Sequence, residues 1–143
     1  MTPPASGPPP GPPAGRDAAL LALRPAVATE PAASAMEAFL HGTLRPVLKL
    51  QNDALLEVVA ADLAKRAPGF AGFDPADQRA RLARLMKTDA RLKRVVLGLV
   101  LGVLTAPERA FALGHEAEVR RRIGALAAER VVSQAGAVAA RVL

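Results

Sequence analysis

The most apolar stretch of the chain, residues 95–104 (VVLGLVLGVL), contains no polar side chain. It covers about half of the ~20 residues that a helix needs to span a bilayer, and polar residues close it at either end. Thr88 and Asp89 provide a helix start, and the piece that follows is longer than a typical strand. We therefore predict a helix over residues 89–104 that is apolar nearly all round in its second half and surrounded by other helices.

Gly98 and Gly102 lie four residues apart on one face of this predicted helix. Each glycine costs about 1 kcal/mol of helix propensity relative to alanine. Such a pair is typical of a place where a second helix approaches closely, although that pattern is best documented in membranes. The alternative is that a Gly- and Ala-rich chain simply has glycines in its helices. We predict a helix-packing contact at these two positions.

A second helix is predicted over residues 34–66. Ser34 and Glu37 form a capping box at its start. Pro46 has no N–H to donate, so we expect a kink or a break near Gly42. Gln51 falls on the apolar stripe of this helix, and a polar residue there needs a partner. We favour a hydrogen bond to a neighbouring backbone; a pocket or a specific contact between helices is the alternative.

The spacing also predicts a helix over residues 75–86, capped by Asp74, and one long helix from residue 107 to the C-terminus. Apolar residues step every three or four positions along this last helix. A stripe of this length can extend beyond one compact domain. We therefore predict that its last part, with Val131 and Val138, forms an interface with a second copy of the chain or with a partner helix.

The N-terminal part has a different composition. Residues 1–33 hold most of the chain's 13 prolines, and we predict a disordered Pro-rich arm there, with a short apolar segment at 17–24 that docks on the domain. The arm contains the P-x-x-P spacing that SH3 and WW domains bind, but we favour a plain spacer. Residues 34–143 are predicted to form one all-α domain, a small bundle of about four main helices.

Composition supports this fold class. The chain has 51 % hydrophobic but only 3 % aromatic residues, so its core must consist of Leu, Val and Ala, which favours helices over sheets. It has no cysteine, which excludes disulfide scaffolds and thiolate zinc sites. No secretory signal and no transmembrane segment is predicted. We expect a cytoplasmic protein.

The net charge of +6 favours an acidic partner: a nucleic acid, an anionic membrane surface or an acidic protein. Arginines concentrate around the turn between the predicted helices 75–86 and 89–104. A candidate anion-binding face is therefore formed by Arg79, Arg81, Arg84, Arg91 and Arg94. The chain lacks aromatic platforms on which bases stack, so binding of a nucleic acid would rest on phosphate contacts alone.

Candidate catalytic groups are few. Two predicted helices each carry an imidazole near a carboxylate, namely His41 with Glu37 and His115 with Glu118. A carboxylate-bridged metal pair in a helical bundle needs further ligands, which the spacing does not supply. The serines do not lie on a nucleophile elbow, and no glycine-rich phosphate loop occurs. We predict no catalytic residue, no cofactor and no metal, and leave open whether Gln51, His41 and His115 line a site.

By elimination, the sequence favours a non-catalytic helical interaction or accessory protein that acts through helix–helix contacts. Its partner is expected to be another protein or a second copy of the chain. The alternative is a basic nucleic-acid-associated protein that contacts phosphates through Arg-rich helices.

Overall fold

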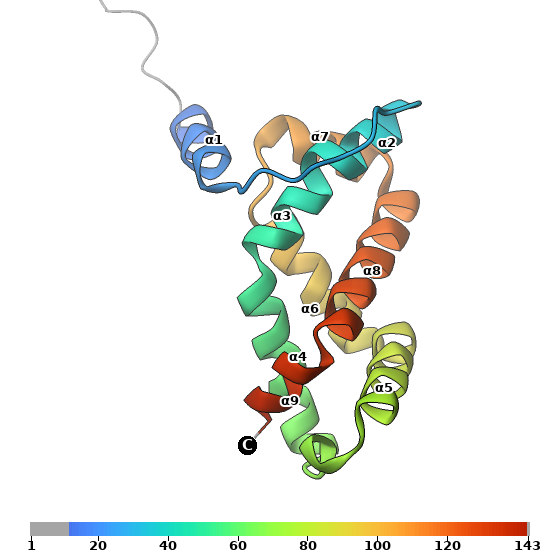
Figure 1. Cartoon of the computed structure of the whole chain (residues 1–143). Coiled ribbons are helices and arrows are strands. Elements are labelled where there is room, and N and C mark those ends of the chain that lie inside the picture. Colours follow the sequence, from blue (N-terminus) through green and yellow to red (C-terminus); the bar gives the residue numbers. More distant parts are fainter. Residues whose placement is uncertain (1–11, 143) are drawn as a thin grey trace, which may run out of the picture.

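The computed structural model describes residues 12–142, which are helical with short connections and contain no strand (Figure 1). The all-α prediction is confirmed. The predicted Pro-rich arm lies outside the described residues as far as residue 11. The elements in chain order are α1 (Pro12–Leu23), α2 (Ala35–Phe39), the π-helix η1 (Leu40–Leu44), α3 (Arg45–Leu50), α4 (Asn52–Arg66), the 3₁₀ turn η2 (Phe70–Gly72), α5 (Pro75–Thr88), α6 (Ala90–Leu101), α7 (Ala106–Gly114), α8 (Glu116–Ser133) and α9 (Ala135–Arg141).

The described helices outnumber the four that the sequence predicts, because two of the predicted helices are divided. The helix expected over residues 34–66 contains the π-helix η1, in which the N–H of Arg45 donates to the carbonyl of Leu40. This wider turn accommodates Pro46, whose missing N–H would have left a gap in a regular ladder. The same helix breaks again at Gln51, where φ is −90° and ψ is 10°.

The predicted C-terminal helix is also divided, at two residues that are neither Gly nor Pro. His115 has φ −129° and ψ 39°, and Gln134 has φ −112° and ψ 29°. The long apolar stripe is thereby folded back on the domain, since α9 packs against both α4 and α5. The last part of the chain is part of the core of its own domain.

The core lies between α3, α4, α5, α6, α8 and α9, and its side chains are mainly Leu and Val, as the composition predicts. The central element is α8, which contacts α3, α4, α5, α6, α7 and α9 (Figure 1). The prediction of a helix surrounded on all sides at residues 89–104 is wrong. In α6 only Leu92, Val96 and Val100 are buried, because one side of this helix lies at the surface.

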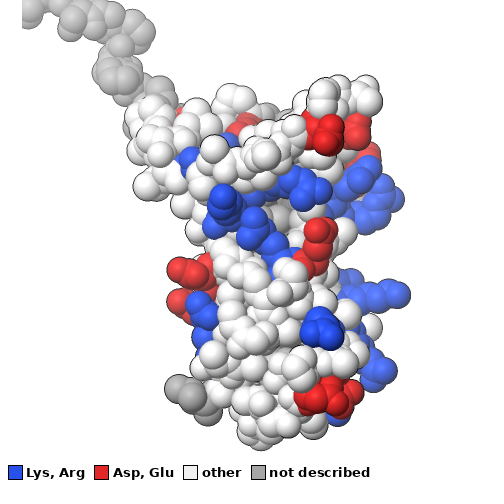
Figure 2. Space-filling view, viewed as in Figure 1, with Lys and Arg blue, Asp and Glu red and all other residues white. Residues whose placement is uncertain are grey.

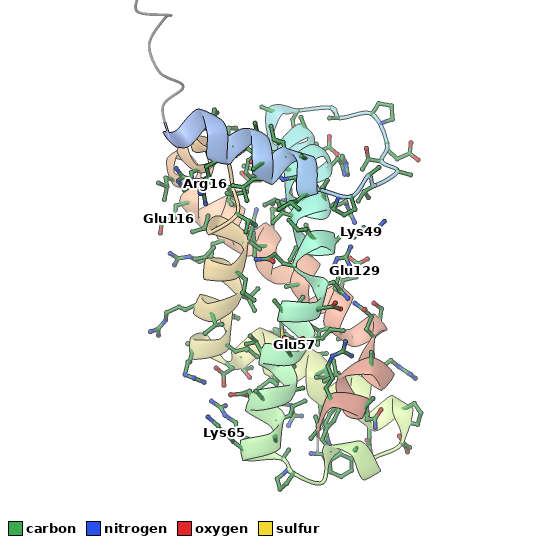
Figure 3. All side chains as sticks on the ribbon, turned by 90° about the vertical axis from the view of Figure 1, so that its left-hand side faces the viewer. Arg16, Lys49, Glu57, Lys65, Glu116 and Glu129 are labelled. Atoms are coloured by element: carbon green, nitrogen blue, oxygen red, sulfur yellow. The ribbon has the colours of Figure 1, made fainter. Side chains whose placement is uncertain are left out.

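The short apolar segment predicted at 17–24 docks on the domain as expected, within a helix that begins earlier, at Pro12. Helix α1 lies across the end of the bundle (Figure 3). The guanidinium of Arg16 donates to the carbonyls of Gly102 (2.6 Å) and Leu104 (3.2 Å), at the C-terminal end of α6. The carboxylate of Asp17 accepts from the N–H of Ala106 (3.0 Å), at the start of α7. A cation at a helix C-terminus and an anion at an N-terminus are both favourable, so α1 is docked on the domain by matched charges.

A buried ion pair closes this contact. Arg24 donates two hydrogen bonds to the carboxylate of Glu108, at 2.5 and 2.6 Å, and the two side chains are 7 % and 16 % exposed. Glu108 also accepts from the N–H of Thr105 (2.8 Å) and the hydroxyl of Thr43 (3.2 Å). Burial raises the pKa of Glu108, but these hydrogen bonds and the charge of Arg24 outweigh it and lower the pKa to about 2.

Within residues 12–142, no helix combines the length and the apolar character that crossing a bilayer requires.

Candidate functional site

A groove of about 870 Å³ lies between α5, α6 and α8. The floor of the groove is apolar, and many of its side chains are small. The helix turns that face it carry Ala or Gly at positions where a packed core would carry Leu. A Cβ atom at Gly124 would meet no other atom within 4 Å, which shows that this part of the groove is unfilled. The principal floor residues are Met86, Val96, Leu97, Ile123, Gly124 and Ala128.

The rim of the groove is basic. It consists of Lys87, Lys93, Arg94, Arg120 and Arg121, and all five side chains are exposed. The lining contains no Asp or Glu. Figure 2 shows Lys and Arg atoms projecting along the edge of the molecule where α5 and α8 lie. We call this hollow, with its apolar floor and cationic edge, the basic-rimmed groove.

Some of these cations are already paired. Arg120 forms an ion pair with Glu116 at 2.6 Å, and Arg121 approaches Glu118 at 3.7 Å, both within α8 and exposed. Among the described residues, Lys87, Lys93 and Arg94 have no carboxylate within ion-pair distance. The α5–α6 side of the groove therefore carries positive charge that the protein itself does not neutralise.

The arginines predicted as one anion-binding face lie in different environments. Arg81 lies over the ring of Phe73, 3.8 Å from its centroid, and Arg91 pairs with buried Asp62 at 3.5 Å. Arg79 and Arg84 are exposed on α5 outside the groove. Of the predicted set, only Arg94 lines the groove.

The residues predicted as helix-packing or interface positions lie in two different environments. Val131 and Val138 are 0 % exposed, so their packing partners are helices of the same chain and neither is accessible to another molecule. Gly98 is exposed, and a Cβ atom there would meet nothing within 4 Å, so no described helix packs closely against it. A Cβ atom at Gly102 would lie 3.0 Å from the carbonyl oxygen of Gly98, which belongs to the same helix.

Gln51 has the backbone partner that the sequence predicts. Its side-chain amide donates to the carbonyl of Leu99 at 2.8 Å. That carbonyl lies in the last turn of α6, where the ladder tightens and the N–H of Val103 bonds to Val100 instead. The amide therefore satisfies an acceptor that the helix end leaves open, and Gln51 has a structural role.

Of the groups considered as metal ligands, His115, Glu37 and Glu118 are engaged separately, and the buried Nδ1 of His41 has no hydrogen-bond partner among the described residues. His115 stacks on Phe111, with ring centroids 4.2 Å apart, and its Nδ1 lies 2.9 Å from the Phe111 carbonyl. Glu37 accepts from the N–H of Ala33, and Glu118 approaches arginines of its own helix. Among the described residues, no three potential ligands converge.

The chain matches no protein-family model, no curated protein and no solved structure.

Proposed function

We propose that this protein is a non-catalytic helical interaction protein and that the basic-rimmed groove is its binding site. We propose as the occupant an acidic amphipathic helix of a partner protein. The observation that carries the proposal is the combination of an unfilled apolar floor with a rim that holds cations only.

The floor favours a helical occupant. A groove between helices that is lined by small side chains admits the apolar side chains of a further helix, spaced at i, i+3, i+4 and i+7. Binding would remove from water the partly exposed side of Leu97 and the open surface beside Gly124. Removal of apolar surface from water is the usual source of affinity in such contacts.

The rim favours an acidic occupant. Glu and Asp side chains on the flanks of a docked helix would lie opposite Lys87, Lys93 and Arg94, which have no carboxylate partner among the described residues. Opposite charges at a rim raise the association rate and select the partner more than they add affinity. A nucleic acid would satisfy the same cations but would leave the apolar floor exposed.

The test uses two synthetic helical peptides with the same leucine spacing, one with glutamates on its flanks and one with lysines. Binding of each labelled peptide to the full chain is measured by fluorescence anisotropy. We expect the acidic peptide to bind in the micromolar range or tighter and to weaken with salt, and the basic peptide not to bind. Equal binding of both peptides would contradict the proposal, as would binding of neither.

Two glycines provide a matched pair of variants. Gly124→Leu fills the groove, whereas Gly136→Leu places the same side chain on an exposed position of α9 that also has nothing within 4 Å. We expect the first substitution to weaken the acidic peptide at least roughly tenfold, which is about 1.4 kcal/mol, and the second to leave it unchanged. Peptide binding that survives Gly124→Leu would place the site elsewhere.

A duplex DNA of arbitrary sequence serves as a competitor. If it binds at low salt and is released by Arg79→Glu with Arg84→Glu but not by Gly124→Leu, the basic nucleic-acid-associated function would replace the proposed one. Contacts to phosphates alone are strongest at low salt, so DNA binding is most readily detected under this condition.

A further inference from the structure

A second, smaller hollow of about 330 Å³ lies between α3 and α8, beneath the extended segment that follows α1. Figure 2 shows it on the face turned to the viewer, with blue atoms along two sides and red atoms on a third. Three apolar side chains line part of it, namely Val27 from the extended segment, Leu48 from α3 and Leu126 from α8. This pocket is separate from the basic-rimmed groove, with which it shares no lining residue.

Two arginines line this pocket. Arg45 comes from the start of α3 and Arg130 from the last turns of α8, and both side chains are half-buried. Burial lowers the pKa of Arg130, and the charge of Arg45 lowers it further. Neither arginine has a carboxylate within ion-pair distance among the described residues. The positive charges of Arg45 and Arg130 therefore lie near each other, and neither is paired with a carboxylate of the described residues.

Glu129 also lines the pocket, and its negative charge raises the pKa of Arg130. Lys49, which lies on the same side of the molecule (Figure 3), donates to the carbonyl of Ala26 at 3.3 Å and holds the extended segment against α3. The two arginines and the one glutamate that line the pocket therefore leave an excess of one positive charge.

One of the two guanidiniums is held in position. Arg130 donates through Nη1 to the side-chain oxygen of Asn52 at 3.2 Å. That oxygen also accepts from Gln134 at 2.8 Å, and the amide of Asn52 donates back to Gln134 at 2.9 Å. This paired amide contact holds Arg130 in the pocket wall through Nη1 alone, so its other N–H groups can donate to a ligand. A preorganised arginine loses less freedom when it binds an oxyanion.

We propose that this pocket binds the carboxylate or phosphate group of a small organic anion between Arg45 and Arg130. Guanidinium groups bind such oxyanions through paired hydrogen bonds. The short apolar part of the ligand lies against Val27, Leu48 and Leu126. The Glu129 carboxylate selects ligands that carry one anionic group and a hydrogen-bond donor over those that carry several anionic groups.

The test uses butyrate and butyl phosphate as probes, with butanol as the uncharged control. Binding to the full chain is followed by the NMR signals of the arginine Nε–H groups. We expect each anion to shift the signals of Arg45 and Arg130 saturably, with the other arginines unaffected, and butanol to have no effect. Which anion binds more tightly distinguishes a carboxylate ligand from a phosphate ligand.

Arg45→Gln is the informative variant, because Arg45 makes none of the hydrogen bonds that hold Asn52 and Gln134. We expect it to weaken both anions at least roughly tenfold, whereas Arg79→Gln, on the exposed surface of α5 and outside the pocket lining, leaves binding unchanged. Shifts spread evenly over all arginines, or binding that Arg45→Gln does not alter, would overturn the proposal. Since the probes are not peptides and the groove is elsewhere, either outcome is independent of the proposed partner helix.

Discussion

Gly98 lies within α6 on its exposed side, where a Cβ atom would meet no other atom within 4 Å. Alanine is about 1 kcal/mol more favourable than glycine inside a helix, and here it meets no obstacle. We expect Gly98→Ala to raise the free energy of unfolding by about 0.5–1 kcal/mol. The measurement is urea denaturation followed by circular dichroism.

Gly102→Ala is the control for that substitution. A Cβ atom at Gly102 would lie 3.0 Å from the carbonyl oxygen of Gly98, so part of the gain is lost to crowding. We expect a smaller gain than at Gly98, or a loss. If Gly98→Ala destabilised the protein, a second helix would have to approach that face, as the glycine spacing in the sequence predicts.

Gln51 shows how far reasoning about single residues extends. A polar residue on an apolar stripe needs a hydrogen-bond partner, and Gln51 has the backbone acceptor that is predicted for it. The sequence pattern does not predict which carbonyl accepts, because Leu99 belongs to a different helix, 48 positions away in the chain. The need for a bond is local, but the identity of its partner depends on the tertiary fold.

At the scale of elements, helix starts were predictable and several helix ends were not. Capping by Asp74 and Thr105 gives the starts of α5 and α7. The breaks at Gln51 and Gln134 carry no Gly or Pro signal. Both residues use their side chains on distant partners, the Leu99 carbonyl and Asn52, so tertiary contacts rather than local propensity decide where these helices end.

The docking of α1 leads to a prediction about that element. Arg24→Ala removes both guanidinium hydrogen bonds from the carboxylate of Glu108, which is 16 % exposed. Removal of one partner of a buried ion pair costs about 3 kcal/mol or more. We expect the amides of α1 to lose most of their protection from hydrogen exchange, while those of α8 remain protected.

The control removes an exposed pair. Arg141→Ala breaks the contact with Asp53, at 3.7 Å, whose side chain is 84 % exposed, and one hydrogen bond to the carbonyl of Ala137 in its own helix. Exposed ion pairs contribute less than about 1 kcal/mol, so hydrogen exchange in α1 is expected to stay as in the unaltered chain. Retained protection of α1 in Arg24→Ala would mean that Arg16 and Asp17 are sufficient to dock it.

At the scale of the whole molecule, the sequence supplies the ingredients of the groove but not its assembly. The cations at 87, 93 and 94 and those at 120 and 121 are evident as basic groups along the chain. They become one rim only because α5 and α6 both pack on α8. Periodicity places a residue on a face of its own helix, whereas the neighbours of that face depend on the order in which the helices pack.

The dependence of global stability on pH follows from Glu108. Its pKa is lowered from 4.5 to about 2, so its ionised form favours the folded state. This stabilisation is complete above the unfolded-state pKa of 4.5 and is lost as the pH falls toward about 2. The shift corresponds to about 3 kcal/mol. As the pH falls from about 5 to about 2, we expect the free energy of unfolding to decrease in both proteins. We expect the decrease to be about 3 kcal/mol larger in the unaltered chain than in Glu108→Gln.

Urea denaturation at several pH values between about 5 and about 2 measures this difference. Asp89, whose pKa is also lowered, chiefly by its hydrogen bond from the N–H of Leu92, titrates in both proteins and cancels from the comparison. Glu108→Gln starts from a lower stability, because an amide does not pair with Arg24, but its stability changes less with pH. If the two curves ran parallel, Glu108 would have the same pKa in the folded and unfolded states, and the ion pair with Arg24 would not stabilise the fold.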